Sequence, residues 1–193
     1  NDQGTYVFRT DDLGASWSSL ASANLRGWAW CLEEDPVDPN LLFLGTELGL
    51  WVSFDAGAHW VQWTHGLPTV SVSALAVHPC EHDLVIATHG RALYVVDDIR
   101  ALRGLTPEVV AEPLHLFDIA PAQEHVVAQA LGPRFAGSDE FRGENRPYGA
   151  LIDYSICFQG HQYHSLAQAL NSAWFDPSYF SRCWERITSE FRL

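Results

Sequence analysis

Short runs of alternating apolar and polar residues, separated by turn-forming residues, fill the first hundred positions of the chain. They predict five strands in the best-defined stretch: WVSF 51–54, HWVQW 59–63, SVSALAV 71–77, LVIAT 84–88 and ALYVV 92–96. The segments HGLPT, HPCEHD and HGR between them are rich in turn formers. The pattern predicts an all-β fold of short antiparallel strands.

One eight-residue pattern occurs twice, as TDDLGASW at 10–17 and SFDAGAHW at 53–60. Its Asp12 and Asp55 lie 43 residues apart, and the same step leads to Asp98, where the Gly and Trp are missing. Flanking positions keep the step too: Val7, Leu50 and Leu93, and Phe8, Trp51 and Tyr94. A period of about 40–50 residues built from short strands is typical of β-propeller blades, each a four-stranded sheet.

We call the repeated pattern the Asp box and interpret it as a structural device in the turn between the third and fourth strands of a blade. The Asp can accept hydrogen bonds from amides of its own turn, the Gly permits a positive φ, and the Trp can fill space between blades. An active site would need unlike residues converging once. The residues assigned this structural role are Asp12, Gly14, Trp17, Asp55, Gly57 and Trp60.

Ligand binding is expected at the opposite end of the blades, because successive hairpin loops alternate between the two ends of an antiparallel sheet. The loops at that end follow the second and fourth strands. They offer a candidate ligand face of six residues: Arg26, Trp28, Glu47, His65, His89 and Arg91.

Charge narrows the range of partners. The formal net charge is -13, with 11 arginines, no lysine and 24 acids. No basic stripe is visible that could neutralise phosphates, so we expect no nucleic-acid partner. A phosphate-binding loop and Schiff-base chemistry both need a lysine, so neither is expected in this segment. No apolar run is long enough to span a membrane. We expect no cofactor and no metal, and neutral or cationic ligands remain open.

The two Asp boxes, together with GTELGL, GLPTVSVSALAVHP and DLVIATHGRALYVVDDI, resemble the last blades of a bacterial sortilin-like, BNR-repeat propeller, a family often labelled glycosyl hydrolase. The resemblance covers roughly residues 1–155. It implies a large secreted or periplasmic protein, with the remaining blades as partners of this segment. The chain lacks methionine and opens within a strand pattern, so we expect a fragment with an incomplete ring.

Four regions are predicted. Residues 1–105 hold two to three propeller blades, 106–147 a linker with a possible strand (LHLFDI), and 148–156 the start of a truncated β-domain. Residues 157–193 form an atypical tail that could hold two short helices, at 165–174 and after Asp176. Its abrupt change of composition leaves open a mis-translated or artificially terminated segment.

Three functions remain open for the segment: recognition of a peptide or glycan, a scaffold of blades, or part of a glycoside hydrolase whose catalytic residues lie mostly in missing blades. No catalytic set can be mapped here, although Glu47 could be one of a carboxylate pair. The cluster His78, Cys80, His82 and Asp83 is interpreted as a turn rather than a metal site, because ordinary turn formers occupy the same place one repeat earlier. Arg91 is expected to pair with Asp97 or Asp98.

Overall fold

The computed structural model describes residues 4–122, 150–158 and 161–169. The chain divides into two compact units, Asn1–Glu112 and Pro113–Leu193. The first unit contains three antiparallel sheets in chain order, and the second contains one. Most described elements are strands, and the few helices are short, so the fold is mainly β.

The first two sheets of the first unit hold both Asp boxes. A two-stranded sheet pairs β1 (Phe8–Arg9) with β2 (Ser18–Ser19). The complete four-stranded sheet has the order β3 (Ala29–Glu34), β4 (Leu42–Thr46), β5 (Gly49–Ser53) and β6 (Val61–Trp63). Each strand pairs antiparallel with the next along the chain, as predicted for one blade. The strands predicted at 51–54 and 59–63 are confirmed with slightly shifted bounds.

The third sheet has only three strands: β7 (Val72–Val77), β8 (Leu84–Thr88) and β9 (Leu93–Val96). These are the strands predicted at 71–77, 84–88 and 92–96. After β9, where the second sheet has its Asp box and a fourth strand, the chain instead forms α1 (Arg100–Arg103) and α2 (Pro107–Ala111). The sequence analysis did not predict these two short helices. The third sheet, at which the Asp box is degenerate, therefore has one strand fewer than the second sheet.

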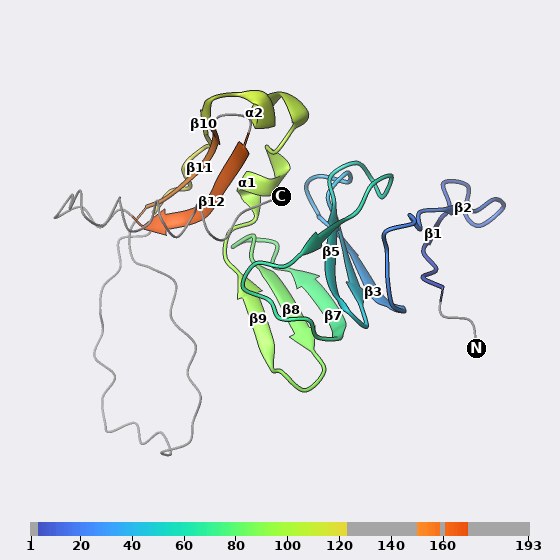
Figure 1. Cartoon of the computed structure of the whole chain (residues 1–193). Helices are drawn as coiled ribbons and strands as arrows, with labels where there is room; N and C mark the ends of the chain where they lie inside the picture. Colours follow the sequence, from blue (N-terminus) through green and yellow to red (C-terminus); the bar gives the residue numbers. More distant parts are fainter. Residues whose placement is uncertain (1–3, 123–149, 159–160, 170–193) are drawn as a thin grey trace, which may run out of the picture. The chain divides into compact units, whose positions relative to one another are not determined.

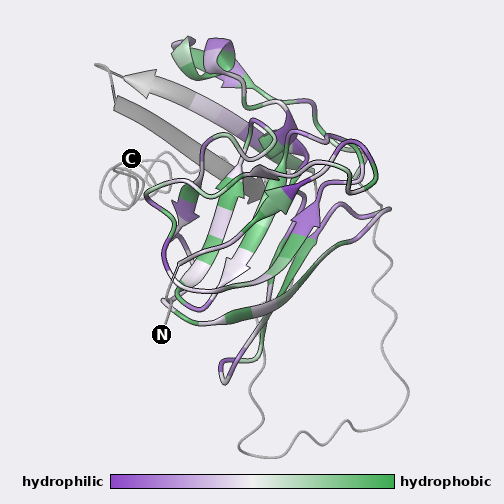
Figure 2. Ribbon diagram, turned by 90° about the vertical axis from the view of Figure 1, so that its right-hand side faces the viewer, coloured by the Kyte–Doolittle hydropathy of each residue, from purple (hydrophilic) through white to green (hydrophobic). Residues whose placement is uncertain are grey.

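The three sheets follow one another side by side across the first unit (Figure 1). Trp51 and Trp60 of the second sheet belong to an apolar cluster that includes Val7 and Leu25, which flank the first sheet. On the opposite face, Gly45 comes so close to Val72 of β7 that an added Cβ would lie 2.8 Å from its side chain. Apolar residues are concentrated on these strands (Figure 2), so the core of the unit lies between the sheets.

A buried ion pair ties α1 to the loop after β3. Arg103 donates from Nε and Nη2 to the two carboxylate oxygens of Asp35, at 2.8 and 2.7 Å, although the residues are 68 positions apart. Burial alone raises the pKa of Asp35, but hydrogen bonds from Arg103 and from the amides of Asp38 and Val37 outweigh it and hold the pKa below its usual value. A bidentate, buried pair of this kind fixes geometry strongly.

The second unit contains a three-stranded antiparallel sheet with the order β10 (Leu114–Leu116), β11 (Leu151–Phe158) and β12 (His161–Ala169). A strand does form within LHLFDI. The helix predicted from Ser165 is wrong for residues 165–169, because β12 pairs along its length with the long strand β11. The rest of the two predicted tail helices and most of the predicted linker lie outside the described residues.

None of the described sheets closes on itself, and the partial propeller stays a prediction. No helix among the described residues is long and apolar enough to cross a membrane.

Candidate functional site

The two Asp boxes fold into the same turn, bond for bond. In the first, Thr10 Oγ1 accepts from the Gly14 amide at 2.8 Å, and Asp12 Oδ1 accepts from the Ser16 amide at 2.8 Å. In the second, Ser53 Oγ accepts from Gly57 at 2.8 Å, and Asp55 Oδ1 accepts from His59 at 2.8 Å. The glycine φ angles are 92° and 90°, in the left-handed region that glycine tolerates. The predicted hydrogen bonds and positive φ angles are confirmed.

The remaining carboxylate oxygen of each box Asp is also held within its own turn. Asp12 Oδ2 accepts from Ser16 Oγ, and Asp55 Oδ2 is bonded to His59 Nδ1, both at 2.6 Å. Hydrogen bonds from Ser16 and Thr10 lower the pKa of Asp12 to about 2. At Asp55 burial raises the pKa, but the hydrogen bonds from His59 and Ser53 together outweigh it and hold the pKa below its usual value. Both carboxylates are thus ionised and engaged by their turns.

The two box tryptophans differ. Trp60 is 2% exposed, packs in the cluster with Val7 and Leu25, and donates from its indole nitrogen to the Leu20 carbonyl at 2.9 Å. Trp17 is 62% exposed and donates only to the Gly14 carbonyl of its own turn, at 3.2 Å. The prediction that both tryptophans fill space between sheets therefore holds for Trp60 and is wrong for Trp17, which no described residue covers.

The predicted ligand face is assembled only in part. The Glu47 amide donates to the Trp28 carbonyl at 3.0 Å, and the His89 amide donates to the Ser71 carbonyl at 2.9 Å, so two turns sit against the starts of β3 and β7. Glu47 and Trp28 are therefore neighbours. All six residues of the predicted face are exposed: Arg26, Trp28, Glu47, His65, His89 and Arg91. Within the described part of the chain, no hydrogen bond or ion pair joins their side chains into one cluster.

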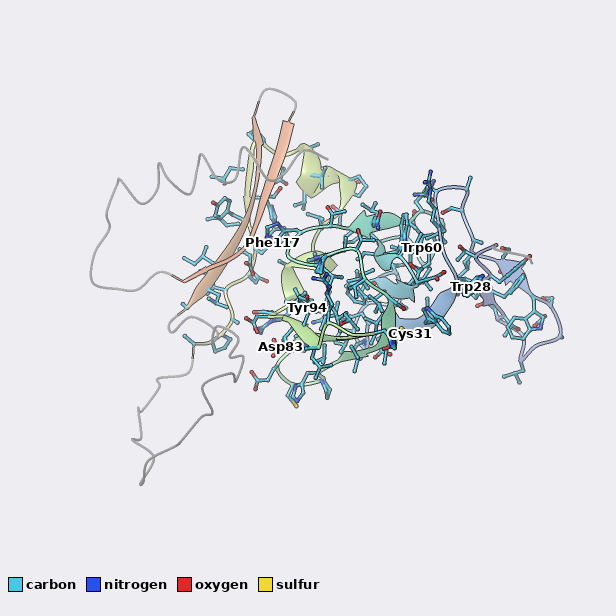
Figure 3. The ribbon with its side chains drawn as sticks, turned by 60° about the horizontal axis from the view of Figure 1, so that its bottom comes forward. Trp28, Cys31, Trp60, Asp83, Tyr94 and Phe117 are labelled. Carbon is cyan, nitrogen blue, oxygen red and sulfur yellow. The ribbon has the colours of Figure 1, made fainter. Side chains whose placement is uncertain are left out.

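An aromatic pair that the sequence analysis missed stands beside Glu47. Trp28 and Trp30 meet edge to face with ring centroids 6.4 Å apart, and both are about half exposed. Leu32, two positions further along β3, is also exposed. The signal was present in the sequence, since Trp28, Trp30 and Leu32 alternate with Ala29, Cys31 and Glu33. Figure 3 labels Trp28 and Cys31 in this region of the second sheet.

A shallow hollow lies at the same end of the second sheet, between the β4–β5 turn and the loop after β6. Its volume is about 260 Å³, and its lining is Leu48, Gly49, Gln62, Trp63, Thr64, Leu67, Pro68 and Thr69. Trp63 is held there by a hydrogen bond from its indole nitrogen to the His65 carbonyl at 2.8 Å. The hollow therefore adds a further tryptophan, threonine hydroxyls and an amide to the end of the sheet that carries Trp28 and Glu47.

Two sequence interpretations concern the third sheet. HPCEHD does form a turn, in which the His78 amide donates to the Asp83 carbonyl at 2.8 Å and the His82 amide to the His78 carbonyl at 2.9 Å. The described ranges contain no group of three or more His, Cys, Asp or Glu residues that could hold a metal ion. No hydrogen bond or ion pair among the described residues joins Arg91 to Asp97 or Asp98, its predicted partners. Asp98 instead accepts two bonds from Arg100, at 2.6 and 2.7 Å, because Arg100 lies two residues further on, at the start of α1.

Comparison of the chain with protein-family models, with curated proteins and with solved structures finds no match to any of them.

Proposed function

We propose that the chain is a recognition segment of an exported, sortilin-like Asp-box propeller, and that it binds cationic peptide segments through Trp28 and Trp30, the exposed tryptophans at the start of β3. The observation that carries the proposal is the half-exposed Trp28–Trp30 pair, whose Trp28 carbonyl accepts a hydrogen bond from the Glu47 amide. In this proposal the Asp boxes stabilise their own turns, and other repeats of the same kind complete the ring as partners of this segment.

The chemistry of this surface favours a positively charged ligand. Tryptophan faces attract arginine and lysine side chains, by about 0.5–2 kcal/mol for each contact. Glu47, in the turn between β4 and β5, supplies an exposed carboxylate at the end of the sheet that carries Trp28, and Glu34 is an exposed acid at the other end of β3. The net charge of -13 draws cations to the whole molecule and repels anions. A neutral glycan could also stack on the indole rings, which makes it the competing ligand class.

The glycoside hydrolase alternative has less support. Hydrolysis of a glycosidic bond uses two carboxyl groups on either side of the bond. The Glu47 side chain is exposed and makes no hydrogen bond or ion pair within the described residues. Nothing in its surroundings fixes it as an acid or a nucleophile, whereas the aromatic pair beside it is already formed.

Calorimetric titration with short arginine- and lysine-containing peptides, and in parallel with neutral oligosaccharides, tests the proposal. We expect the peptides to bind, Trp28→Ala to weaken binding by roughly 2- to 30-fold, and added salt to weaken it further. Trp17→Ala, which removes another exposed tryptophan at the opposite, Asp-box turn of the first sheet, is the matched control and should leave binding unchanged. Binding of oligosaccharides alone would overturn the ligand class. Hydrolysis of aryl glycosides that is lost in Glu47→Gln would overturn recognition in favour of catalysis.

A further inference from the structure

Equivalent positions of the three sheets differ in burial in a regular way. Val7, Leu50 and Leu93 occupy one place in the repeat. Val7 and Leu50 are 7% and 0% exposed, whereas Leu93 is 65% exposed. Val95, two positions along the same strand, is also exposed, although its equivalent Val52 is buried. Within the described residues, the face of the third sheet that carries Leu93 and Val95 thus lacks the cover that the first two sheets have. We call it the trailing face.

The opposite faces show the reverse order. Trp51 is 5% exposed, but its equivalent in the first sheet, Phe8, is 52% exposed. The pair Trp60 and Trp17 repeats the same contrast. Tyr6 stacks on Phe8 with ring centroids 6.3 Å apart and is exposed too. The first sheet therefore has an uncovered aromatic surface, which we call the leading face: Tyr6, Phe8 and Trp17.

Contacts inside the chain show which surface covers which. The leading-type face of the second sheet, with Trp51 and Trp60, is covered by the trailing-type residue Val7 of the first sheet and by Leu20 and Leu25 after it. The trailing-type face of the second sheet, at Gly45, is covered by Val72 of the third, whose carbonyl also lies 3.7 Å from Cys31 Sγ. In both junctions a trailing-type face meets a leading-type face. The two uncovered faces are one of each type.

We propose that the leading face of one copy of this chain binds the trailing face of a second copy. The chain carries both halves of a contact that it already makes twice internally, so a second copy offers each half its complement. Because the two faces differ, the contact is head-to-tail, and it closes into a ring or continues as a chain of copies. Exposed apolar clusters of this kind mark association surfaces on soluble proteins.

Charge sets the conditions under which the contact forms. Each copy has a net charge of -13, so two copies repel each other at low ionic strength. Burial of aromatic and aliphatic side chains drives the association and is not weakened by salt. Association should therefore become stronger as salt screens the repulsion. Binding of the cationic peptide proposed above should have the opposite salt dependence. It depends on attraction between unlike charges, which salt screens.

Sedimentation velocity of the full chain over a range of protein and salt concentrations tests the proposal. We expect the average mass to rise with both. Trp17→Arg disrupts the leading face and Leu93→Arg the trailing face, so each variant alone should stay monomeric. An equimolar mixture of the two should form a one-to-one dimer, because each variant retains the face that the other has lost. Val37→Arg, which changes an equally exposed apolar residue in the loop after β3, should associate like the parent chain.

Three results would overturn the proposal. One is a chain that stays monomeric at high protein and salt concentrations. Another is a mixture of the two variants that does not pair, which would show that the leading and trailing faces do not bind each other. The third is a Leu93→Arg variant with lowered thermal stability and unchanged mass, which would show that the trailing face is covered within the same molecule. Trp28→Ala leaves both faces intact, so a failure of peptide recognition and a failure of assembly are separate outcomes.

Discussion

The two Asp boxes are the same turn in two environments. The lengths of equivalent hydrogen bonds in the two turns agree within 0.1 Å. These bonds include the one that the Thr10 or Ser53 hydroxyl donates to the Asp12 or Asp55 carboxylate. Only the second box buries its tryptophan against a neighbouring sheet. The comparison separates two contributions that a complete blade would combine. The turn forms from its own residues, while burial of the tryptophan depends on what lies beside it.

Removal of the tryptophans should give the largest difference between the boxes. Trp60→Ala deletes a side chain that is 2% exposed and breaks its bond to the Leu20 carbonyl, so we expect a loss of about 3–5 kcal/mol in the free energy of unfolding. Trp17→Ala deletes a side chain that is mostly in solvent and should cost no more than about 1 kcal/mol. Urea unfolding followed by circular dichroism measures both values.

This measurement should be made in dilute protein, where the chain is a single copy. Equal losses for the two tryptophans would contradict the difference in burial. A large loss for Trp17→Ala that appears only at high protein concentration would instead support the head-to-tail contact, because association stabilises the folded state by mass action.

Substitution of the box glycines should also destabilise the second box more than the first, by a smaller difference in the free energy of unfolding. An alanine at either position must adopt a φ near 90°, which costs on the order of 1–2 kcal/mol. At Gly57 the new Cβ would also lie 2.8 Å from Leu20 Cδ1 and 3.3 Å from Leu20 Cβ and Cγ, whereas at Gly14 its nearest neighbour is the Trp17 ring at 3.7 Å. We expect Gly57→Ala to destabilise the chain by about 1–3 kcal/mol more than Gly14→Ala. Thermal unfolding of the two variants is the measurement, and equal costs would show that Leu20 moves aside freely.

Local patterns predicted local structure well in the first unit. The strands at 84–88 and 92–96 follow from short apolar runs between turn formers, and the Asp-box turn follows from residues within eight positions of one another. The ion pair of Arg103 with Asp35 could not be predicted in this way. Its partners are 68 residues apart, and nothing in the local sequence distinguishes Arg103 from its neighbour Arg100, which pairs with Asp98.

The candidate site was predicted less well than the fold. Alternation of hairpin loops correctly placed Trp28 and Glu47 at one end of the second sheet, where a backbone hydrogen bond joins them. It could not show that no hydrogen bond or ion pair joins the side chains of Arg26, His89 and Arg91 within the described residues, because that depends on side-chain directions. Trp30 lies within β3 and not in a hairpin loop, so a prediction based on loops did not include it. The exposure of Trp17 could not be predicted from the repeat, since the repeat describes what the boxes share.

Acid should weaken both boxes, and the first one in a defined range of pH. The pKa of Asp12 is about 2 in the folded chain, against about 3.9 for an ordinary aspartate, so its carboxylate stabilises the turn above about pH 4. That stabilisation is lost as the pH falls through 2. The Asp55 pKa is lowered as well, so the second box should lose its contribution in the same direction. The amide resonances of Ser16 and His59, which report the bonds to these carboxylates, follow the titration by NMR. A midpoint for Asp12 near 3.9 would contradict the hydrogen-bond geometry.

The smallest effect on stability is expected from a substitution at His59. Its equivalent in the first box is Ser16, so this position bonds to the Asp through an imidazole in one turn and through a hydroxyl in the other. His59 bonds to Asp55 Oδ2 through Nδ1 at 2.6 Å, as Ser16 does to Asp12 Oδ2 through its hydroxyl, and the His59 side chain is otherwise exposed. His59→Ser should therefore rebuild the first box in the second and change the free energy of unfolding by less than about 0.5 kcal/mol. His59→Ala, which keeps the backbone bond but leaves Asp55 Oδ2 without its side-chain donor, is the matched comparison and should cost about 0.5–1.5 kcal/mol. A His59→Ser variant as unstable as His59→Ala would contradict this expectation. It would mean that a serine hydroxyl cannot replace the imidazole as the partner of Asp55 Oδ2 in the second box.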